Sequence, residues 1–238
     1  MKRNYWLCLL LLPLLALLPA RKDTAVAPAL AREPAGYIAL TFDDSPNGTT
    51  TERLLDGLLE REARATFFII GQQIEGQEDI LRRMAAEGHQ IGNHTFTHRR
   101  LDNSGAVGLH ELERTEELLS ATLGGGDCWV RPPWGFASVE TLRETAVPLI
   151  HWSLDTEDWS VLNADKVARR IVDNVQDGDI VLLHDSYESS VDAALWAIDE
   201  LQARGWVFVT VEELFEQMGV APETGCLYSR PDQLRPVK

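Results

Sequence analysis

Basic residues are scarce in this sequence. Its 238 residues contain 22 lysines and arginines against 37 aspartates and glutamates, which gives a formal net charge of −15 and an isoelectric point near 4.8. Nucleic acids and other polyanions are bound through basic surface. The shortage of positive charge therefore argues against a nucleic-acid partner, and it leaves neutral or cationic polymers open.

Cysteines are also few, at three in the whole chain. Cys8 precedes most of a hydrophobic run at the N-terminus, which makes it a poor site for lipid attachment. The other two, Cys128 and Cys226, allow one disulfide in an oxidising compartment. Whether they pair depends on a geometry that the sequence does not fix.

Long hydrophobic runs are confined to the N-terminus. Lys2 and Arg3 precede a leucine-rich stretch over residues 5–18, and two A-x-A patterns follow at 25–27 and 29–31. The stretch is short and contains Pro13, so it is marginal as a membrane span. We expect an export signal rather than an uncleaved anchor, and a secreted, periplasmic or cell-envelope protein that contacts a membrane only if this segment is retained.

From Gly36 onward, short apolar runs alternate with helical patterns. The expected strands are 36–43, 65–70, 89–94, 128–131, 148–154, 179–184 and 206–209, and the expected helices are 49–61, 79–87, 106–123, 138–145, 165–175, 190–204 and 211–218. This divides the chain into a leader with linker (1–35), one α/β domain (36–218) and an irregular C-terminal tail (219–238). Alternating strands and helices indicate parallel pairing, in an open doubly wound sheet or a (β/α) barrel.

Polar residues at strand ends favour the barrel. In a barrel the carboxyl ends of all strands converge on one face, whereas an open sheet would spread some of them away from a single site. We therefore predict a barrel of seven strands rather than eight. The residues at or just past these ends are Asp43, Asp44, His94, Arg131, Asp155, Asp158 and His184.

The first expected strand ends in two adjacent carboxylates, within TFDDSP at 41–46. Both can reach one cavity where the strand unwinds, and like charges that close require a cation or a shared proton. A simpler interpretation is that Asp44 or Ser45 caps the following helix. The aspartate pair alone does not decide between these two interpretations.

Two histidines four residues apart lie in HTFTH at 94–98. On a helical turn this spacing places His94 and His98 on one side, near enough to share a cation. One added carboxylate from the aspartate pair gives a ligand set suited to catalytic zinc or another divalent first-row metal. Non-haem iron oxygenases use the same set, but they usually have all-β folds, which the alternation disfavours.

Five ordered motifs resemble those of the polysaccharide deacetylase family, the NodB-type carbohydrate esterases (carbohydrate esterase family 4). They are TFDDSP (41–46), HTFTH (94–98), RPPWG (131–135), DTEDW (155–159) and LLHD (182–185). The resemblance covers residues 36 to about 215, and it implies a distorted (β/α)7 barrel of the NodB-homology type. It departs from the family pattern at Ser45, where glycine is usual, and at Trp134, where tyrosine is commoner.

The resemblance implies a metal site and a base. Asp44, His94 and His98 would hold one divalent ion, which we expect to be Zn²⁺, with Co²⁺ or Ni²⁺ as alternatives. Asp43 would be the general base, and Arg131 would pair with it and keep it ionised.

The resemblance also implies the remaining roles. His184 would be the general acid, oriented by Asp158. The backbone N–H of Trp134 would stabilise the oxyanion, and Leu182 with Trp159 would wall a pocket for the acetyl methyl group. The other tryptophans are expected in the core rather than as platforms for sugars, although one at the mouth of the barrel could stack on a sugar ring; they are Trp129, Trp152, Trp196 and Trp206.

The resulting hypothesis is an exported, monomeric, metal-dependent hydrolase that removes N-acetyl groups from amino sugars of peptidoglycan or a chitin-like polysaccharide. One alternative is an O-acetyl esterase acting on acetylxylan-type polysaccharide. The other is a carbohydrate-binding protein without turnover, against which the acid and base groups argue.

Overall fold

The computed structural model of the chain describes residues 33–236. The expected export segment and most of the linker lie outside these residues. Within the described part, no helix is long and apolar enough to cross a membrane.

A parallel sheet forms the centre of the domain. Its strand order is β3-β2-β1-β6-β5, and β7 pairs with the first residues of β1. A second sheet has the order β4-β8-β9, in which only β8 and β9 are antiparallel. The strands are β1 (Gly36–Ser45), β2 (Thr66–Ile69), β3 (Gln90–Asn93), β4 (Leu149–Ile150), β5 (Leu154–Asp155), β6 (Ile180–His184), β7 (Trp206–Phe208), β8 (Leu227–Arg230) and β9 (Gln233–Leu234).

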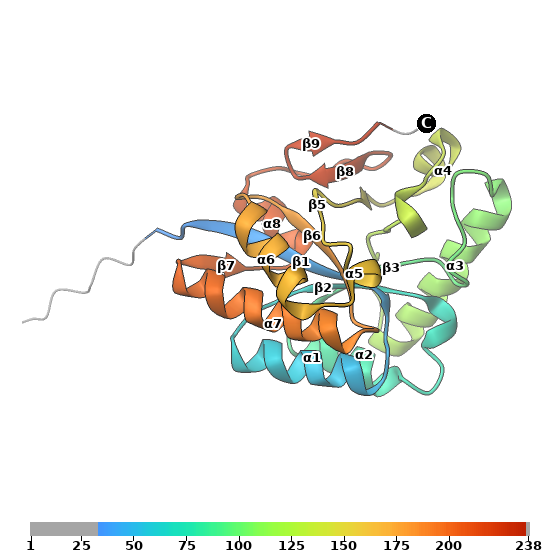
Figure 1. Cartoon of the computed structure of the whole chain (residues 1–238). Coiled ribbons are helices and arrows are strands. Elements are labelled where there is room, and N and C mark those ends of the chain that lie inside the picture. Colours follow the sequence, from blue (N-terminus) through green and yellow to red (C-terminus); the bar gives the residue numbers. More distant parts are fainter. Residues whose placement is uncertain (1–32, 237–238) are drawn as a thin grey trace, which may run out of the picture. The chain divides into compact units, whose positions relative to one another are not determined.

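Helices cover the sheet, and α1, α2 and α7 lie along one side of it (Figure 1). Their ends follow local chemistry: a capping box at Thr210 starts α8, and Gly124, with a φ of 92°, ends α3. The helices are α1 (Thr49–Glu60), α2 (Glu78–Ala86), α3 (Gly105–Leu123), α4 (Val139–Glu144), α5 (Asp158–Val161), α6 (Ala164–Asn174), α7 (Glu188–Ala203) and α8 (Val211–Gln217), with 3-10 turns at Gly71–Gln73 and Pro133–Gly135.

The two sheets are linked through Val130, which makes parallel bridges to Asn93 of β3 and to Leu149 of β4. The domain is thus an α/β fold consistent with a distorted (β/α) barrel, as predicted. The expected strand at 128–131 is wrong, because only this bridge forms. Pro132 and Pro133 follow at once and have no N–H to extend a ladder.

The expected strand at 148–154 is divided into β4 and β5. The N–H of His151 donates to the carbonyl of Tyr228, and two residues later the N–H of Ser153 donates to the carbonyl of Ile180. The segment therefore changes its partner from β8 to β6, and a single continuous strand cannot serve both.

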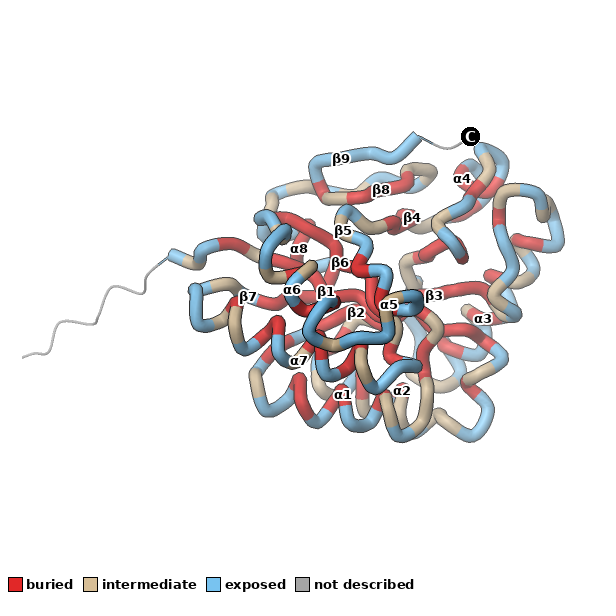
Figure 2. Tube along the Cα trace, in the orientation of Figure 1, coloured by how far each residue is buried: buried red, intermediate tan, exposed pale blue. Residues whose placement is uncertain are grey.

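The largest apolar core surrounds β1. Leu40 and Phe42 are fully buried, and Phe42 stacks on Phe67 of β2 with ring centroids 5.3 Å apart. In Figure 2 the buried segments follow the strands and the inward faces of the helices. Burial of each large apolar side chain contributes about 1.5–3 kcal/mol, so this core holds the end of β1 in a fixed position.

The C-terminal tail is not irregular throughout. Residues 227–230 form β8, which pairs with β4, and Tyr228 packs edge-on against Phe215 with ring centroids 5.1 Å apart. The expectation of an irregular surface tail is wrong for this segment. Leu227, Tyr228 and Ser229 are all buried, so the strand shows no alternation by which the sequence could reveal it.

The two cysteines described by the structure are free thiols. Cys128 packs against the core around β1, and Cys226 packs against a different cluster that includes Phe215. Burial and the neighbouring Glu116 raise the pKa of Cys128 to about 12. The disulfide that the sequence allowed is not formed, and this thiol is unreactive at neutral pH.

The buried β8 yields a stability prediction. Replacing Tyr228 by alanine removes a buried aromatic ring and should lower the free energy of unfolding by about 3 kcal/mol. Leu234→Ala on β9, where the side chain is 57% exposed, should change it by no more than about 0.5 kcal/mol. Chemical denaturation of both variants measures the difference, and equal small effects would show that β8 is not part of the cooperative core.

Candidate active site

The candidate site lies at the carboxyl end of β1. Asp43 is in register with His184 of β6, so parallel pairing brings the first aspartate and the last motif to the same edge. Asp44 has a φ of 62°, and this left-handed residue departs from the alternation of a strand. Ser45, where the family usually has glycine, is not among the residues with positive φ and is accommodated without such strain.

Three donor atoms converge beside β1. The Oδ1 atom of Asp44 lies 3.3 Å from the Nε2 atom of His98 and 3.6 Å from that of His94. All three lie within 4.8 Å of one another. The two imidazoles do not lie on a helical turn, as the sequence suggested, but on a loop in which Thr95 and His98 have φ values of 66° and 60°.

These donors fit a divalent cation. The Oδ1 atom of Asp44 is buried and has no hydrogen-bond partner among the described residues. The Nδ1 atom of His94 is 2.7 Å from the carbonyl oxygen of Arg131, which leaves its Nε2 atom free to ligate. Burial and the neighbouring His94 lower the pKa of His98, which favours the neutral imidazole that a metal requires.

Arg131 holds the other aspartate. It is fully buried, and its Nη1 atom donates to Asp43 Oδ1 at 2.7 Å and to Thr41 Oγ1 at 2.6 Å. Burial favours the neutral carboxyl, but Arg131 and the nearby imidazoles outweigh burial and lower the pKa of Asp43. A surface salt bridge is excluded, and the base candidate is ionised at neutral pH.

His184 is paired with Asp158, the buried first residue of α5. The Nδ1 atom of His184 lies 2.9 Å from Asp158 Oδ1, and the backbone N–H of His184 donates to Oδ2 at 2.7 Å. Burial alone would lower the pKa of His184, but the carboxylate outweighs it and raises the pKa to about 9. His184 is therefore an imidazolium at neutral pH.

A cavity of about 430 Å³ is lined by both aspartates of β1 and by His94, His98 and His184, whereas Arg131 and Asp158 are buried and do not line it. Leu182 also lines it and is buried, and Trp134 and Trp159 line it and are 54% and 55% exposed. The ring of Trp134 lies 4.1 Å from that of His98. The structure therefore brings together the predicted base, metal donors, acid and pocket residues around one space.

Gly135 fixes the loop that carries Trp134. Its φ is 72°, and a Cβ atom there would lie 2.3 Å from Nε2 of the buried His151. A residue with a Cβ atom would therefore have to displace the ring of His151, and it would also crowd Trp152 at 3.1 Å.

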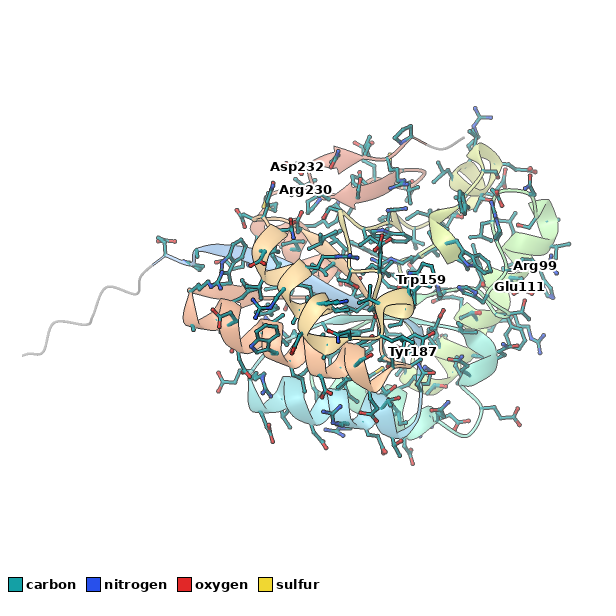
Figure 3. The ribbon with its side chains drawn as sticks, viewed as in Figure 1. Arg99, Glu111, Trp159, Tyr187, Arg230 and Asp232 are labelled. Atoms are coloured by element: carbon teal, nitrogen blue, oxygen red, sulfur yellow. The ribbon has the colours of Figure 1, made fainter. Side chains whose placement is uncertain are left out.

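Three further residues line the cavity that the sequence analysis did not select, namely Phe136, Trp152 and Tyr187. Asp155, which the sequence analysis placed at a strand end without a role, lines it as well. Trp152 was expected in the core, but it lies at the cavity, where its ring stacks on His151 with centroids 3.8 Å apart. Phe136 and Tyr187 closely follow the RPPWG and LLHD motifs, and this proximity was the one available signal. Figure 3 shows Tyr187 and Trp159 near the starts of α7 and α5.

The donor cluster predicts metal uptake. The chain should bind one divalent ion, and Asp44→Ala, His94→Ala or His98→Ala should weaken binding at least about a hundredfold, because each removes one ligand atom. Calorimetric titration with Zn²⁺ measures this. His110→Ala, which changes an exposed histidine on α3, is the matched control, and unaltered binding in all three variants would contradict the assignment.

The His184–Asp158 pair predicts a pH-dependent stability. The pKa of His184 is raised above 6.5, so the pair stabilises the fold fully below about pH 6.5 and loses this contribution as pH rises through about 9. In metal-free protein, Asp158→Asn should therefore lower the free energy of unfolding more at pH 6 than at pH 10. Asp155→Asn is the control, and a difference that stays constant with pH would refute the pairing.

Comparisons with known proteins agree with the family that the motifs resemble. Residues 31–147 match the family model described as polysaccharide deacetylase. Peptidoglycan-N-acetylglucosamine deacetylase PgdA of Listeria monocytogenes is 33% identical over 179 residues, which cover 75% of this chain and 38% of the relative. A peptidoglycan-N-acetylglucosamine deacetylase of Bacillus cereus is 35% identical over 210 residues, which cover 76% of this chain and 94% of the relative.

The fold is similar to solved structures of the same kind. A family 4 acetyl xylan esterase from Clostridium thermocellum, in complex with a cobalt ion, has a TM-score of 0.78 and 30% identity over 83% of this chain and 100% of that one. Because the chain spans only 38% of the Listeria relative, that protein contains more than the matched domain. The motifs, the fold and the extent of the match together show that the chain belongs to the polysaccharide deacetylase family.

Proposed function

We propose that the chain is a metal-dependent hydrolase that removes N-acetyl groups from acetylated amino sugars in peptidoglycan or a chitin-like polysaccharide. One observation carries this proposal: a carboxylate kept anionic by Arg131 and an imidazole kept cationic by Asp158 line the same cavity as three metal donors. Hydrolysis of an amide needs this combination of a base for water and an acid for the departing amine.

Asp44, His94 and His98 would hold the ion, for which zinc is the first candidate and cobalt or nickel the alternatives. When bound, a divalent ion polarises a carbonyl oxygen and lowers the pKa of water from about 15.7 to roughly 7. Asp43 is the base that takes the proton from the attacking water. Its Oδ1 atom is engaged by Arg131, so its Oδ2 atom is available for that proton.

His184 gives its proton to the nitrogen of the departing amine, and Asp158 holds the ring in position through Nδ1. The backbone N–H of Trp134 stabilises the oxygen of the tetrahedral intermediate, because the two prolines before it have no N–H to offer. Leu182 and Trp159 enclose the acetyl methyl group.

O-deacetylation is the second candidate. It is supported by the structural similarity to the Clostridium protein, which is described as an acetyl xylan esterase. The same groups would activate water, but an alkoxide leaving group needs less help from a general acid than an amine does. The protonated His184 can supply the proton that an amine leaving group requires. A binding protein without turnover needs neither the Asp43–Arg131 pair nor the His184–Asp158 pair.

We further propose that the chain is exported by its N-terminal segment, that residues 36–218 carry the activity and that the protein acts as a monomer in the cell envelope or outside the cell. The cell-envelope polysaccharide named for the Listeria and Bacillus relatives supports this location. Radiolabelled export assays with and without residues 1–31 would test it.

Acetate release tests the reaction. Wild-type protein should release acetate from chito-oligosaccharides or peptidoglycan more efficiently than from acetylxylan. Asp43→Asn should retain one bound ion and lose about a hundredfold to ten-thousandfold in kcat, because only the base is removed. Preference for acetylxylan would favour the esterase, and activity surviving both a chelator and Asp43→Asn would rule out the mechanism.

The rate should also depend on pH in a defined direction. Because the pKa of Asp43 is lowered and that of His184 is raised to about 9, kcat/KM should be flat across neutral pH and fall as pH rises through about 9. Initial rates between pH 5 and 10.5 measure this. A decline centred near pH 6.5 would mean that His184 does not retain its proton.

A further inference from the structure

A second groove adjoins the cavity. It has a volume of about 560 Å³ and is lined by residues 97–100, 102–104 and Trp134; we call it the arginine groove. His98 and Trp134 line both the groove and the cavity. A sugar chain held at the metal donors would therefore continue into this groove.

The two arginines in the groove differ in their partners. Arg100 donates to both carboxylate oxygens of Asp102, at 2.6 and 3.1 Å, and lies 4.0 Å above the ring of Phe136. Arg99 is exposed, and no carboxylate of the described residues lies within 4.0 Å of its guanidinium nitrogens. After the pairing of Arg100 with Asp102, Arg99 leaves one uncompensated positive charge in the groove.

The nearby acid on α3 does not neutralise this charge. Glu111 accepts hydrogen bonds from the N–H of Thr97 at 2.6 Å and from its hydroxyl at 2.9 Å, both through Oε2. Figure 3 shows Arg99 and Glu111 together on the α3 side, away from Trp159 and Tyr187. The carboxylate of Glu111 thus holds the loop rather than the guanidinium.

The backbone of Arg99 is also fixed. His98 has a φ of 60°, so the chain turns directly after the imidazole, and the N–H of Arg99 donates to Thr95 Oγ1 at 3.0 Å. The metal donor and the free arginine are therefore consecutive residues on one tied loop. An arginine placed in this way selects what lies next to the reacting sugar.

We propose that Arg99 is a specificity-determining residue that binds the carboxylate of an acidic sugar adjacent to the sugar being deacetylated. The guanidinium fork matches a carboxylate in shape and charge. The ligand class is a glycan in which N-acetylated amino sugars alternate with sugars bearing a carboxyl group, either as a lactyl ether or as a uronic acid. This rests on the proposed function and narrows its substrate.

The net charge of the chain, −15, opposes the binding of acidic polymers in general. An acidic glycan therefore depends on a local cation at the site. A neutral polymer such as chitin gains nothing from Arg99. The unpaired guanidinium therefore distinguishes the two substrate types.

Four tetrasaccharides of equal length provide the test: chitotetraose, a peptide-free N-acetylglucosamine–N-acetylmuramic acid repeat, its carboxyl methyl ester, and an N-acetylglucosamine–glucuronic acid repeat. For at least one acidic repeat, Arg99→Glu should lower kcat/KM about tenfold or more, mainly through KM. For chitotetraose and the methyl ester, the same substitution should change kcat/KM less than twofold. Arg99→Lys should recover part of the loss.

Arg143→Glu is the matched control, because it makes the same charge change on the exposed face of α4, outside the groove. Arg143→Glu should leave kcat/KM unchanged for all four substrates. Added salt should raise KM for the acidic repeat in the wild type and not in Arg99→Ala. The acidic repeat that responds identifies the source of the carboxylate.

Two results would overturn the inference. One is an equal effect of Arg99→Glu on charged and uncharged substrates, and the other is no effect on either acidic repeat. If the wild type deacetylates chitotetraose but shows one of these results, only the role of Arg99 fails. If the wild type releases acetate from none of the four, the proposed function fails and the role of Arg99 fails with it.

Discussion

A guanidinium buried beneath the site connects the separate parts of this structure. Arg131 is fully buried, donates to Asp43 and Thr41 of β1, and donates through Nη2 to the carbonyl of His151 at 2.8 Å. The Cζ atom of its guanidinium lies 4.1 Å from the centroid of the Phe68 ring. With a further bond from Nε to the carbonyl of Ile150 at 3.4 Å, four hydrogen bonds and one aromatic contact permit a charge at this depth.

Such a pair is not explained by stability. Burying two charges costs several kcal/mol of solvation, and their attraction repays it only when the geometry is good. What the pair does accomplish is positioning. The backbone N–H of Arg131 donates to the carbonyl of Asn93, and its own carbonyl oxygen receives the Nδ1 side of His94. One residue therefore sets the charge of the base and the orientation of a metal ligand.

The sequence predicted most of the strands, helices and candidate site residues around Arg131. It predicted fewer of the aromatic residues that line the cavity. Most strands and helices from 36 to 217 were recognisable because apolar period and Gly or Pro punctuation agree there, although α5 was not predicted. The candidate ligand and acid–base residues could be selected because they stand at strand ends within ordered motifs. Phe136, Trp152 and Tyr187 were not selected, because an aromatic residue in a loop has no period that separates a cavity wall from a core.

Two failures have a common physical origin. The HTFTH segment was expected to be a helical turn and the tail to be irregular, yet the first turns through left-handed residues and the second contains a buried strand. Both are decided by contacts with distant residues: the carbonyl oxygens of Thr95 and Phe96 accept the N–H groups of Gly71 and Gln72, and Leu227 pairs with Leu149. The spacing of residues within a short segment cannot predict partners that are distant in the sequence.

The distribution of backbone strain bears on why these groups are held so firmly. Among residues 33–236, seven non-glycine residues have positive φ, and four of them lie at the candidate site: Asp44, Thr95, His98 and Trp134. Each such conformation costs of order 1 kcal/mol or more and persists only where the surroundings enforce it. A surface that merely binds sugar could be built from relaxed loops. Strain gathered at Asp44, Thr95, His98 and Trp134 instead indicates atoms that must be held at fixed positions. In the proposed reaction, the opposite charges of Asp43 and His184, which lie in register on neighbouring strands, would supply the two proton transfers.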